Sequence, residues 1–166
     1  MEILLREIGD INMKYNYSSN SNDYKTPPVL YKKALDKFGI NKFSCDVCCS
    51  DENIPAVNYC KQHETDGLKE EWAYKYWFYC WCNPPFKYCI KWVKKAFEES
   101  RKGINVAMLI PARTETAYFH KYILNQPNVE IEFLRKGYKF LNSNNEEMGI
   151  FKNALCLVYF KAVEND

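Results

Sequence analysis

The chain carries two kinds of hydrophobic pattern, and the first kind is helical. Apolar residues recur every three or four positions between the proline pair at 27–28 and Gly39, which predicts a helix that begins at the prolines and ends at the glycine. The same spacing predicts a second helix over 86–101 and a third one over 114–124. In the second helix the apolar residues line one face, and lysines occupy much of the rest.

Short, continuous apolar runs form the second pattern and predict buried strands. The runs are FSCDVCC (43–49, with the strand ending near Asp46), WFYCWC (77–82), INVAMLI (104–110), VEIEFL (129–134), YKFL (138–141) and ALCLVYF (154–160). We expect an irregular segment over 51–68 and a polar loop over 142–152. Strands and helices alternate at first and strands cluster at the end. The pattern therefore predicts an α/β fold with a mainly parallel central sheet, antiparallel strands at one edge and helices on both faces.

Length and composition indicate one domain after a short arm. Residues 1–25 end in the polar, turn-rich stretch YNYSSNSNDY, which predicts an N-terminal arm or loop. Residues 26–166 have the length of one domain with a sizeable core. The sequence has no run of about 18 apolar residues that would span a membrane, and its first ten residues lack the pattern of a signal peptide. We therefore expect a cytoplasmic location.

The eight cysteines raise the question of a metal site or of disulfides. Cys45 and Cys48 have the spacing of a zinc-binding pair, but Cys80 and Cys82 do not, and both histidines stand far away in the sequence. Disulfides are not expected in a reducing compartment. We expect most of the cysteines to behave as small buried hydrophobic residues, with no metal bound. A zinc-stabilised binding domain stays open as an alternative that a metal assay would test.

The motif Asn83-Pro84-Pro85-Phe86 directly follows a predicted strand. In an open α/β sheet, ligands bind outside the carboxyl ends of the strands, which is where this motif falls. Prolines lack an N–H group and hold φ at about −65°, so the corner is stiff. It offers the Asn83 side-chain amide and the Pro84 carbonyl as hydrogen-bond acceptors beside the ring of Phe86. The alternative is that the prolines simply begin a helix that Asn83 caps.

Two fixed acceptors beside a flat apolar face suit a planar group that carries an NH₂, such as adenine. The exocyclic nitrogen of adenine is a weak nucleophile because its lone pair is delocalised into the ring. Hydrogen bonds from its two N–H groups to Asn83 and Pro84 would favour a pyramidal nitrogen whose lone pair faces an electrophilic methyl group. Such a step depends on positioning and electrostatic stabilisation, and it requires no strong base.

Asn-Pro-Pro-Phe also matches the [DNS]-PP-[YFW] signature of S-adenosylmethionine-dependent amino-methyltransferases. The chain as a whole resembles the small phage-type DNA adenine-N6 methyltransferase (Dam) family over residues 24–160. The matching blocks, in chain order, are KTPP, FSCDVCCSDEN, TDGLKEEW, CNPPF, VAMLIPARTETAYFH, FLRKGYKF and ALCLVYF. The resemblance implies a single-domain Rossmann-like methyltransferase fold, S-adenosyl-L-methionine as the cofactor and double-stranded DNA as the partner. It also implies that the target adenine is flipped out of the duplex.

The resemblance implies roles for individual residues. Those expected at the cofactor are Thr26, Pro27, Asp46, Cys48, Ser50 and Asp66. Those expected to form the catalytic corner are Asn83, Pro84, Pro85 and Phe86, with Phe86 stacked on the target base. Those expected to contact the substrate are Lys87, Arg113 and Lys139. The family usually has Gly-Arg where this chain has Gly137-Tyr138, so Lys136 or Lys139 would have to make the contact of the missing arginine.

Each of these residues also has a structural interpretation. Asp46 would then cap a turn at the end of its strand, Asp66 would belong to an ordinary Asp-Gly turn, and the lysines near Lys87 would form a solvated helix face. The net charge of +2 neither indicates a surface that coats nucleic acid nor excludes a local basic patch. Target recognition is expected from the arm over 18–24, the loop over 142–152 and the lysines near Lys87.

The sequence leaves the methylated group open. The same corner chemistry would serve adenine N6, cytosine N4, an RNA base or a protein glutamine amide. A catalytically silent nucleic-acid-binding module that keeps the fold is an alternative of another class. An intact motif at 83–86 argues against it, because a silent protein has no reason to retain the two acceptors.

Overall fold

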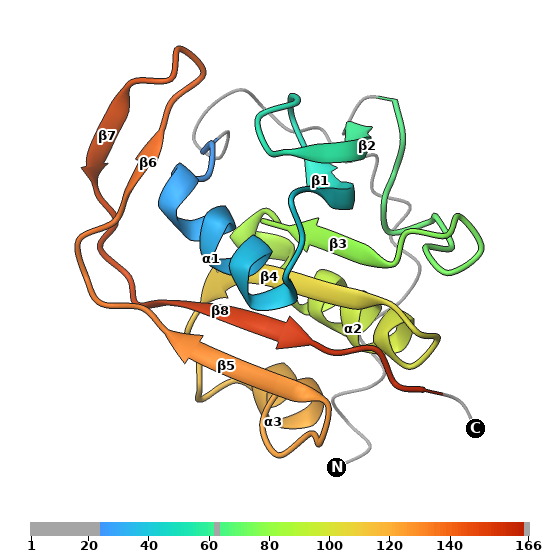
Figure 1. Cartoon of the computed structure of the whole chain (residues 1–166). Helices are drawn as coiled ribbons and strands as arrows, with labels where there is room; N and C mark the ends of the chain where they lie inside the picture. The colour runs from blue at the N-terminus through green and yellow to red at the C-terminus, as the bar shows by residue number, and fades with distance from the viewer. Residues whose placement is uncertain (1–23, 62–63, 165–166) are drawn as a thin grey trace.

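The computed structural model describes residues 24–61 and 64–164. The expected arm over 1–25 lies outside the described residues except for its last two positions. The described part contains a six-stranded sheet, helices on both faces of that sheet and a separate two-stranded hairpin (Figure 1). Its helices are too short to cross a membrane.

The six-stranded sheet has the strand order β2–β1–β3–β4–β8–β5. Its strands are β1 (Phe43–Cys49), β2 (Ala56–Lys61), β3 (Tyr79–Cys82), β4 (Asn105–Pro111), β5 (Val129–Phe133) and β8 (Leu155–Phe160). The pairs β1–β2, β1–β3 and β3–β4 are parallel, whereas β8 is antiparallel to both β4 and β5. The predicted α/β fold, with a mainly parallel sheet and antiparallel pairing toward one edge, is therefore confirmed.

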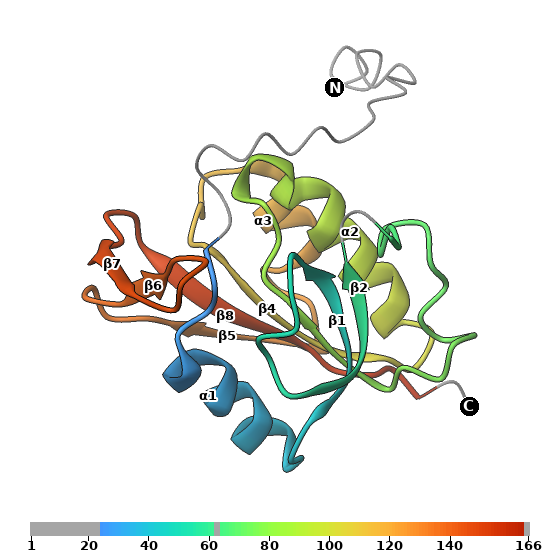
Figure 2. The same ribbon diagram turned by 90° about the horizontal axis from the view of Figure 1, so that it is seen from above.

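Successive residues of a strand point to opposite faces of the sheet. Both faces of this sheet carry apolar side chains, and helices cover both of them. The helix α1 (Pro28–Phe38) packs on the face to which Trp81 of β3 contributes its side chain. The helices α2 (Cys89–Ser100) and α3 (Ala117–Tyr122) lie on the other face, where the neighbours of Trp81 along β3 are buried (Figure 2). As predicted, α1 begins at the proline pair and ends at Gly39, whose φ of 66° favours glycine.

All eight cysteines are buried free thiols. The sulfur atoms of Cys45 and Cys60 lie 3.8 Å apart, and the Cys80 thiol donates to the Trp77 carbonyl at 3.4 Å. Within residues 24–61 and 64–164, no three His, Cys, Asp or Glu side chains are grouped so that they could hold a metal ion. The cysteines therefore fill the core as small hydrophobic residues.

The hairpin of β6 (Lys139–Leu141) and β7 (Glu147–Ile150) stands apart from the main sheet and lies between β5 and β8 along the chain. Lys25 pairs with Leu141 through two backbone hydrogen bonds of 2.9 and 3.0 Å. This bridge holds the segment before α1 against the hairpin. As a result the rings of Tyr24 and Phe140 pack with their centroids 5.7 Å apart.

The structure corrects several element predictions. The segment 51–68, expected to be irregular, contains the edge strand β2, which buries only one of its six residues and so lacks a hydrophobic pattern. The expected loop over 142–152 contains β7, and the YKFL run pairs with β7 instead of joining the main sheet. The first strand continues past Asp46 to Cys49. A short 3₁₀ turn, η2 (Phe86–Tyr88), precedes α2.

Candidate functional site

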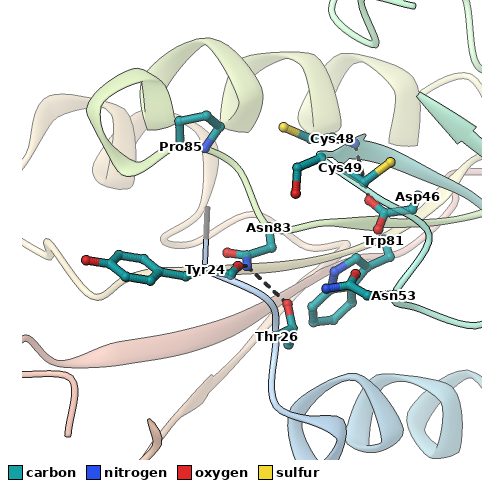
Figure 3. A pocket seen from close by; sticks show the side chains of 10 residues that line it. Tyr24, Thr26, Asp46, Cys48, Cys49, Asn53, Trp81, Asn83 and Pro85 are labelled. Atoms are coloured by element: carbon teal, nitrogen blue, oxygen red, sulfur yellow. Dashed lines mark hydrogen bonds between the residues drawn. The ribbon is translucent and has the colours of Figure 1, made fainter. Parts of the chain in front are cut away.

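The segments that follow β1 and β3 meet the segment before α1 around one polar cavity (Figure 3). We call it the donor-side cavity, because it contains residues that the resemblance implies at the methyl donor. The residues that line it are Tyr24, Thr26, Asp46, Cys48, Cys49, Ser50, Asn53, Trp81, Asn83 and Pro85. The strands β1 and β3 are parallel neighbours in which Asp46 pairs with Trp81, so the residues after them leave the sheet at the same edge. The cavity therefore lies where open α/β sheets bind ligands.

Asp46 is a buried carboxyl group in the wall of this cavity, with 2% of its surface exposed. Among the described residues its hydrogen-bond donor is the backbone N–H of Cys48, at 3.3 Å, and no cation pairs with it. Burial raises the pKa of Asp46 to about 7; the Cys48 bond acts against this, and the charge of Asp51 adds to it. A carboxylate has about four acceptor positions, so this one can still accept hydrogen bonds from a ligand.

The side-chain amide of Asn83 is held in one orientation. Its Nδ2 donates to the Thr26 hydroxyl oxygen at 3.0 Å (Figure 3). The same nitrogen makes a longer contact of 3.5 Å with the Tyr24 carbonyl oxygen. Because the Tyr24 backbone carbonyl can only accept a hydrogen bond, the Asn83 amide must present its nitrogen, and not its oxygen, to Tyr24. Thr26 is 4% exposed, so water does not compete for the contact. The Asn83 oxygen is left as an acceptor for whatever binds beside it.

The carbonyl of Pro84 is a second acceptor at this corner. The turn η2 begins with a hydrogen bond of 2.9 Å from the Tyr88 N–H to the Pro85 carbonyl, one residue after Pro84. Within the described ranges, no donor is bonded to the Pro84 oxygen. Both prolines are buried, and Pro85 has a φ of −56°. The bend is thus rigid, and the secondary structure around it uses neither of the two acceptors.

A second cavity adjoins the same corner. It is lined by Tyr24, Asn83, Pro84, Pro85, Phe86 and Phe140. Because Tyr24, Asn83 and Pro85 line both cavities, they form a shared wall between them. The ring of Phe86 is held edge-on against Phe140 and Phe151, with centroids 6.5 and 5.5 Å away. We call this space the base-side cavity, because it contains Phe86, which the resemblance implies is stacked on the target base.

Comparison of the chain with known proteins identifies its family. The model of the family DNA N-6-adenine-methyltransferase (Dam) matches residues 15–164. The chain belongs to the Dam family. A DNA N-6-adenine-methyltransferase of Escherichia phage T1 is 35% identical over 96 residues, which cover 58% of this chain and 38% of the phage protein. One of Haemophilus phage HP1 is 26% identical over 136 residues, which cover 81% of this chain and 75% of that protein.

The Dam-family resemblance read from the motifs is therefore confirmed, and the α/β sheet agrees with the Rossmann-like fold that it implied. The matched segment spans little more than a third of the length of the phage T1 relative. No solved structure matches the chain.

The Dam-family residues expected at the cofactor divide into two groups. Those that line the donor-side cavity are Thr26, Asp46, Cys48 and Ser50. Pro27 is buried next to Thr26 and stands at the N-terminal cap of α1, outside the cavity lining. Asp66 also lies outside it.

Asp66 begins a tight turn and is engaged within it. Its Oδ1 accepts from the Leu68 N–H at 3.0 Å. The adjoining Gly67 lies so close to β1 that a Cβ atom there would stand 2.0 Å from the Val47 carbonyl oxygen, which excludes any larger residue. These contacts agree with the structural interpretation of an Asp-Gly turn.

The three residues expected at DNA lie in separate places, and none lines either cavity. Lys87 is exposed in η2, with its Nζ 5.6 Å from the centroid of the Tyr88 ring. Arg113 is exposed after β4. Lys139 reaches across the hairpin, and its Nζ lies 3.0 Å from a carboxylate oxygen of Glu147.

Sequence reasoning missed Cys49, Asn53, Trp81 and Phe140 as residues of the two cavities, and it considered Tyr24 only as the end of the recognition arm over 18–24. Trp81 stands two positions before Asn83 and lies inside β3, and its place in a buried apolar run predicts only a strand residue. Tyr24 and Phe140 meet through the bridge between Lys25 and Leu141, which no local pattern signals. No pattern in the sequence around Asn53 predicts that this residue lines the donor-side cavity.

Proposed function

We propose that the chain transfers a methyl group from S-adenosyl-L-methionine to N6 of an adenine flipped out of double-stranded DNA. The observation that carries this proposal is the wall of Tyr24, Asn83 and Pro85 shared by the two cavities. A donor in one cavity and a base in the other would meet at the Asn83 amide. Membership of the Dam family supports adenine N6 as the target atom.

The donor-side cavity has the polar groups that this cofactor needs. The donor supplies an electrophilic methyl group. The buried carboxyl group of Asp46 has unfilled acceptor positions that suit the two ribose hydroxyls of the donor. The Thr26 oxygen accepts from Asn83, so its own hydroxyl proton is available to a carboxylate such as that of the methionine moiety. Cys48 and Ser50 add to the same wall.

Asn83 and Pro84 would act on the target amine by position. Their two oxygen atoms accept the two N–H groups of adenine N6, so the nitrogen becomes pyramidal and its lone pair is directed toward the donor side. As the bond from N6 to the methyl carbon forms, the bond from that carbon to the donor sulfur breaks, and S-adenosylhomocysteine leaves. No side chain has to remove a proton before transfer, because the methylated nitrogen carries positive charge and then loses a proton to water. Phe86, fixed by its ring contacts, would pack against the base.

An adenine paired within a duplex cannot reach this corner, because the corner lies in a cavity wall. Enzymes that act on such a base rotate it out of the stack, which costs a few kcal/mol of stacking and pairing. The proposal therefore includes base flipping. Both substrates occur in the cytoplasm of a host cell, where we expect the chain to act.

Asn83→Ala tests the proposal. Removing one of the two acceptors should lower the rate of methyl transfer by about 100-fold or more, with little change in donor affinity. The rate is measured with radiolabelled donor and duplex DNA, and digestion of the product to nucleosides identifies the methylated atom. The matched control is Asn58→Ala, because Asn58 is an exposed asparagine on β2 that bonds the Ser44 carbonyl, away from both cavities. Full activity of Asn83→Ala, or a product other than N6-methyladenine, would refute the proposal.

A further inference from the structure

Two short segments connect the β6–β7 hairpin to the main sheet, and together with the first residue of β8 we call them the neck (residues 134–138 and 151–155). The Phe151 N–H donates to the Tyr138 carbonyl, and the Leu134 N–H donates to the Leu155 carbonyl, each at 3.0 Å. The two segments therefore run side by side. All ten neck residues line one groove of about 220 Å³.

Three cations of the neck have no acidic partner in the part of the chain that the structure describes. Arg135, Lys136 and Lys152 are exposed, and no described residue makes an ion pair or a side-chain hydrogen bond with them. The neighbouring Lys139 differs, because Glu147 holds it across the hairpin. Three uncompensated positive charges around one groove are unexpected in a chain whose net charge is only +2.

A second groove, of about 370 Å³, continues from the neck to the catalytic corner. It is lined by Tyr24, Phe140 and residues 148–153. It shares residues 151–153 with the neck groove, and it shares Tyr24 and Phe140 with the base-side cavity. Shared walls thus link the base-side cavity to the three cations.

We propose that the neck holds the DNA strand that carries the target adenine, with Arg135, Lys136 and Lys152 on its phosphates. This inference rests on the proposed function. A flipped nucleotide leaves its sugar and phosphates at the mouth of the base-side cavity, so the adjoining nucleotides must lie against whatever surface continues from that mouth. Exposed, unpaired Lys and Arg side chains are the groups that displace counterions from phosphates, and the planar arginine group binds phosphate with two parallel hydrogen bonds.

The other wall of the second groove has the apolar character that nucleotides require. Phe151 packs against Phe140 with ring centroids 5.3 Å apart, and Ile150 is 52% exposed. Sugars and splayed bases contact such apolar and aromatic surfaces, while the cations follow the backbone. Lys139 is assigned to the hairpin itself, where its ion pair joins the two strands, and not to DNA.

The test compares the wild-type chain with a variant that carries Arg135→Gln, Lys136→Gln and Lys152→Gln. Binding of a fluorescein-labelled duplex is followed by anisotropy over a series of salt concentrations. Loss of three phosphate contacts should reduce the slope of log K against log salt by about 2.7, or about 0.9 for each contact. A charge control removes the same charge from three other exposed positions with Lys42→Gln, Lys75→Gln and Lys121→Gln, in the turn after α1, the loop before β3 and α3. Of these three lysines, Lys75 forms an ion pair with Glu70. The control and Lys139→Gln should keep the wild-type slope.

Adenine methylation is measured on the same samples, and this separates the two proposals. A neck variant that keeps the wild-type slope, or a control that loses as much as the neck variant, overturns the neck proposal and leaves the proposed function standing. A slope lost only in the neck variant supports the neck proposal; if the wild-type chain then forms no N6-methyladenine, the proposed function alone is overturned. Absence of DNA binding by the wild-type chain overturns both.

Discussion

The buried polar side chains of the described residues fall into two pairs at opposite ends of the sheet. Thr26 and Asp46 lie beside Asn83 in the wall of the donor-side cavity. Glu99 and Ser100 lie in the last turn of α2, the helix that returns the chain to the start of β4. All four are almost completely buried, yet the two pairs differ in how well the protein satisfies them.

The α2 pair has its partners within the protein. Glu99 accepts from Lys95 at 2.8 Å, from Lys102 at 3.2 Å and from a backbone N–H. Burial acts to raise the pKa of Glu99, but these partners outweigh it, and the pKa lies below its ordinary value. The Ser100 hydroxyl donates to a backbone carbonyl and accepts from Asn128. These groups stabilise the fold.

The pair at the cavity is incompletely satisfied. Among the described residues Asp46 has one backbone donor and no cation, and burial raises its pKa to about 7. The Thr26 oxygen accepts a hydrogen bond from the Asn83 amide nitrogen and so orients that amide. The Asn83 oxygen remains available to accept further hydrogen bonds. A buried acid with all its partners serves the fold, whereas one with missing partners is available to a ligand.

The largest expected effect is on donor binding by Asp46→Asn. Hydrogen bonds to a charged group contribute about 1.5–3 kcal/mol, so loss of the carboxylate should weaken donor affinity about 100-fold. Isothermal titration calorimetry with S-adenosylmethionine measures this directly. The control is Glu99→Gln, an equally buried acid that should bind the donor normally. If both variants bound the donor with equal affinity, Asp46 would be no more available to the ligand than Glu99.

For stability we expect the reverse order, with Glu99→Gln losing more than Asp46→Asn. Glu99→Gln leaves two lysine side chains without their shared partner, and we expect it to lower the free energy of unfolding by about 2 kcal/mol. In a chain of this size that corresponds to a melting temperature about 4–8 °C lower. Asp46→Asn should melt no lower than the wild type at pH 8. Thermal unfolding followed by circular dichroism compares the two variants.

The two acids should also respond to pH with opposite signs. In the donor-free chain, folded Asp46 keeps its proton up to about pH 7, whereas the unfolded chain releases it near the ordinary value. The Asp46 contribution to stability therefore falls as the pH rises toward 7. The Glu99 contribution is present above its ordinary pKa and is lost as the pH falls through its lowered folded pKa.

Urea unfolding at pH 6 and pH 8 tests the Asp46 half of this expectation. Between these values the stability of Asp46→Asn should rise relative to the wild type by about 1.4 kcal/mol, the equivalent of one pKa unit. A difference between variant and wild type that does not change with pH would show that Asp46 has an ordinary pKa in the folded chain.

The smallest expected effect concerns Thr26. Thr26→Val removes the hydrogen bond that orients Asn83, and we expect turnover at saturating donor to fall about fivefold, the equivalent of about 1 kcal/mol. Thr26→Ser keeps the hydroxyl and should restore the rate. Ser100→Ala removes a buried hydroxyl of the other pair and should lower stability while leaving turnover unchanged. A change confined to the KM of the donor would assign Thr26 to the cofactor alone.

Local patterns were sufficient to predict much of the fold and part of the site. The apolar runs located β1, β3, β4, β5 and β8, and the parallel α/β pattern brought Asp46 and Asn83 to one edge of the sheet. The proline pair and Gly39 fixed both ends of α1. These features depend on neighbours in sequence, which is why they could be predicted.

The missed features depend on contacts between distant segments. Tyr24 reaches both cavities because Lys25 pairs with Leu141, and the sequence does not contain that register. The edge strand β2 buries too little to show a period. The lysines of α2 were considered for phosphate contact as a group, but Lys95 is engaged with Glu99, a pairing that becomes visible only when the helix is seen packed on the sheet.

The position of β8 has a consequence for synthesis of the chain. It lies between β4 and β5 but follows both of them along the sequence. While the chain emerges from the ribosome, the very apolar β4 has an open edge until residues 155–160 have left the exit tunnel. An exposed apolar edge pairs readily with other chains. Nascent chains arrested before residue 155 should therefore depend on chaperones and aggregate without them.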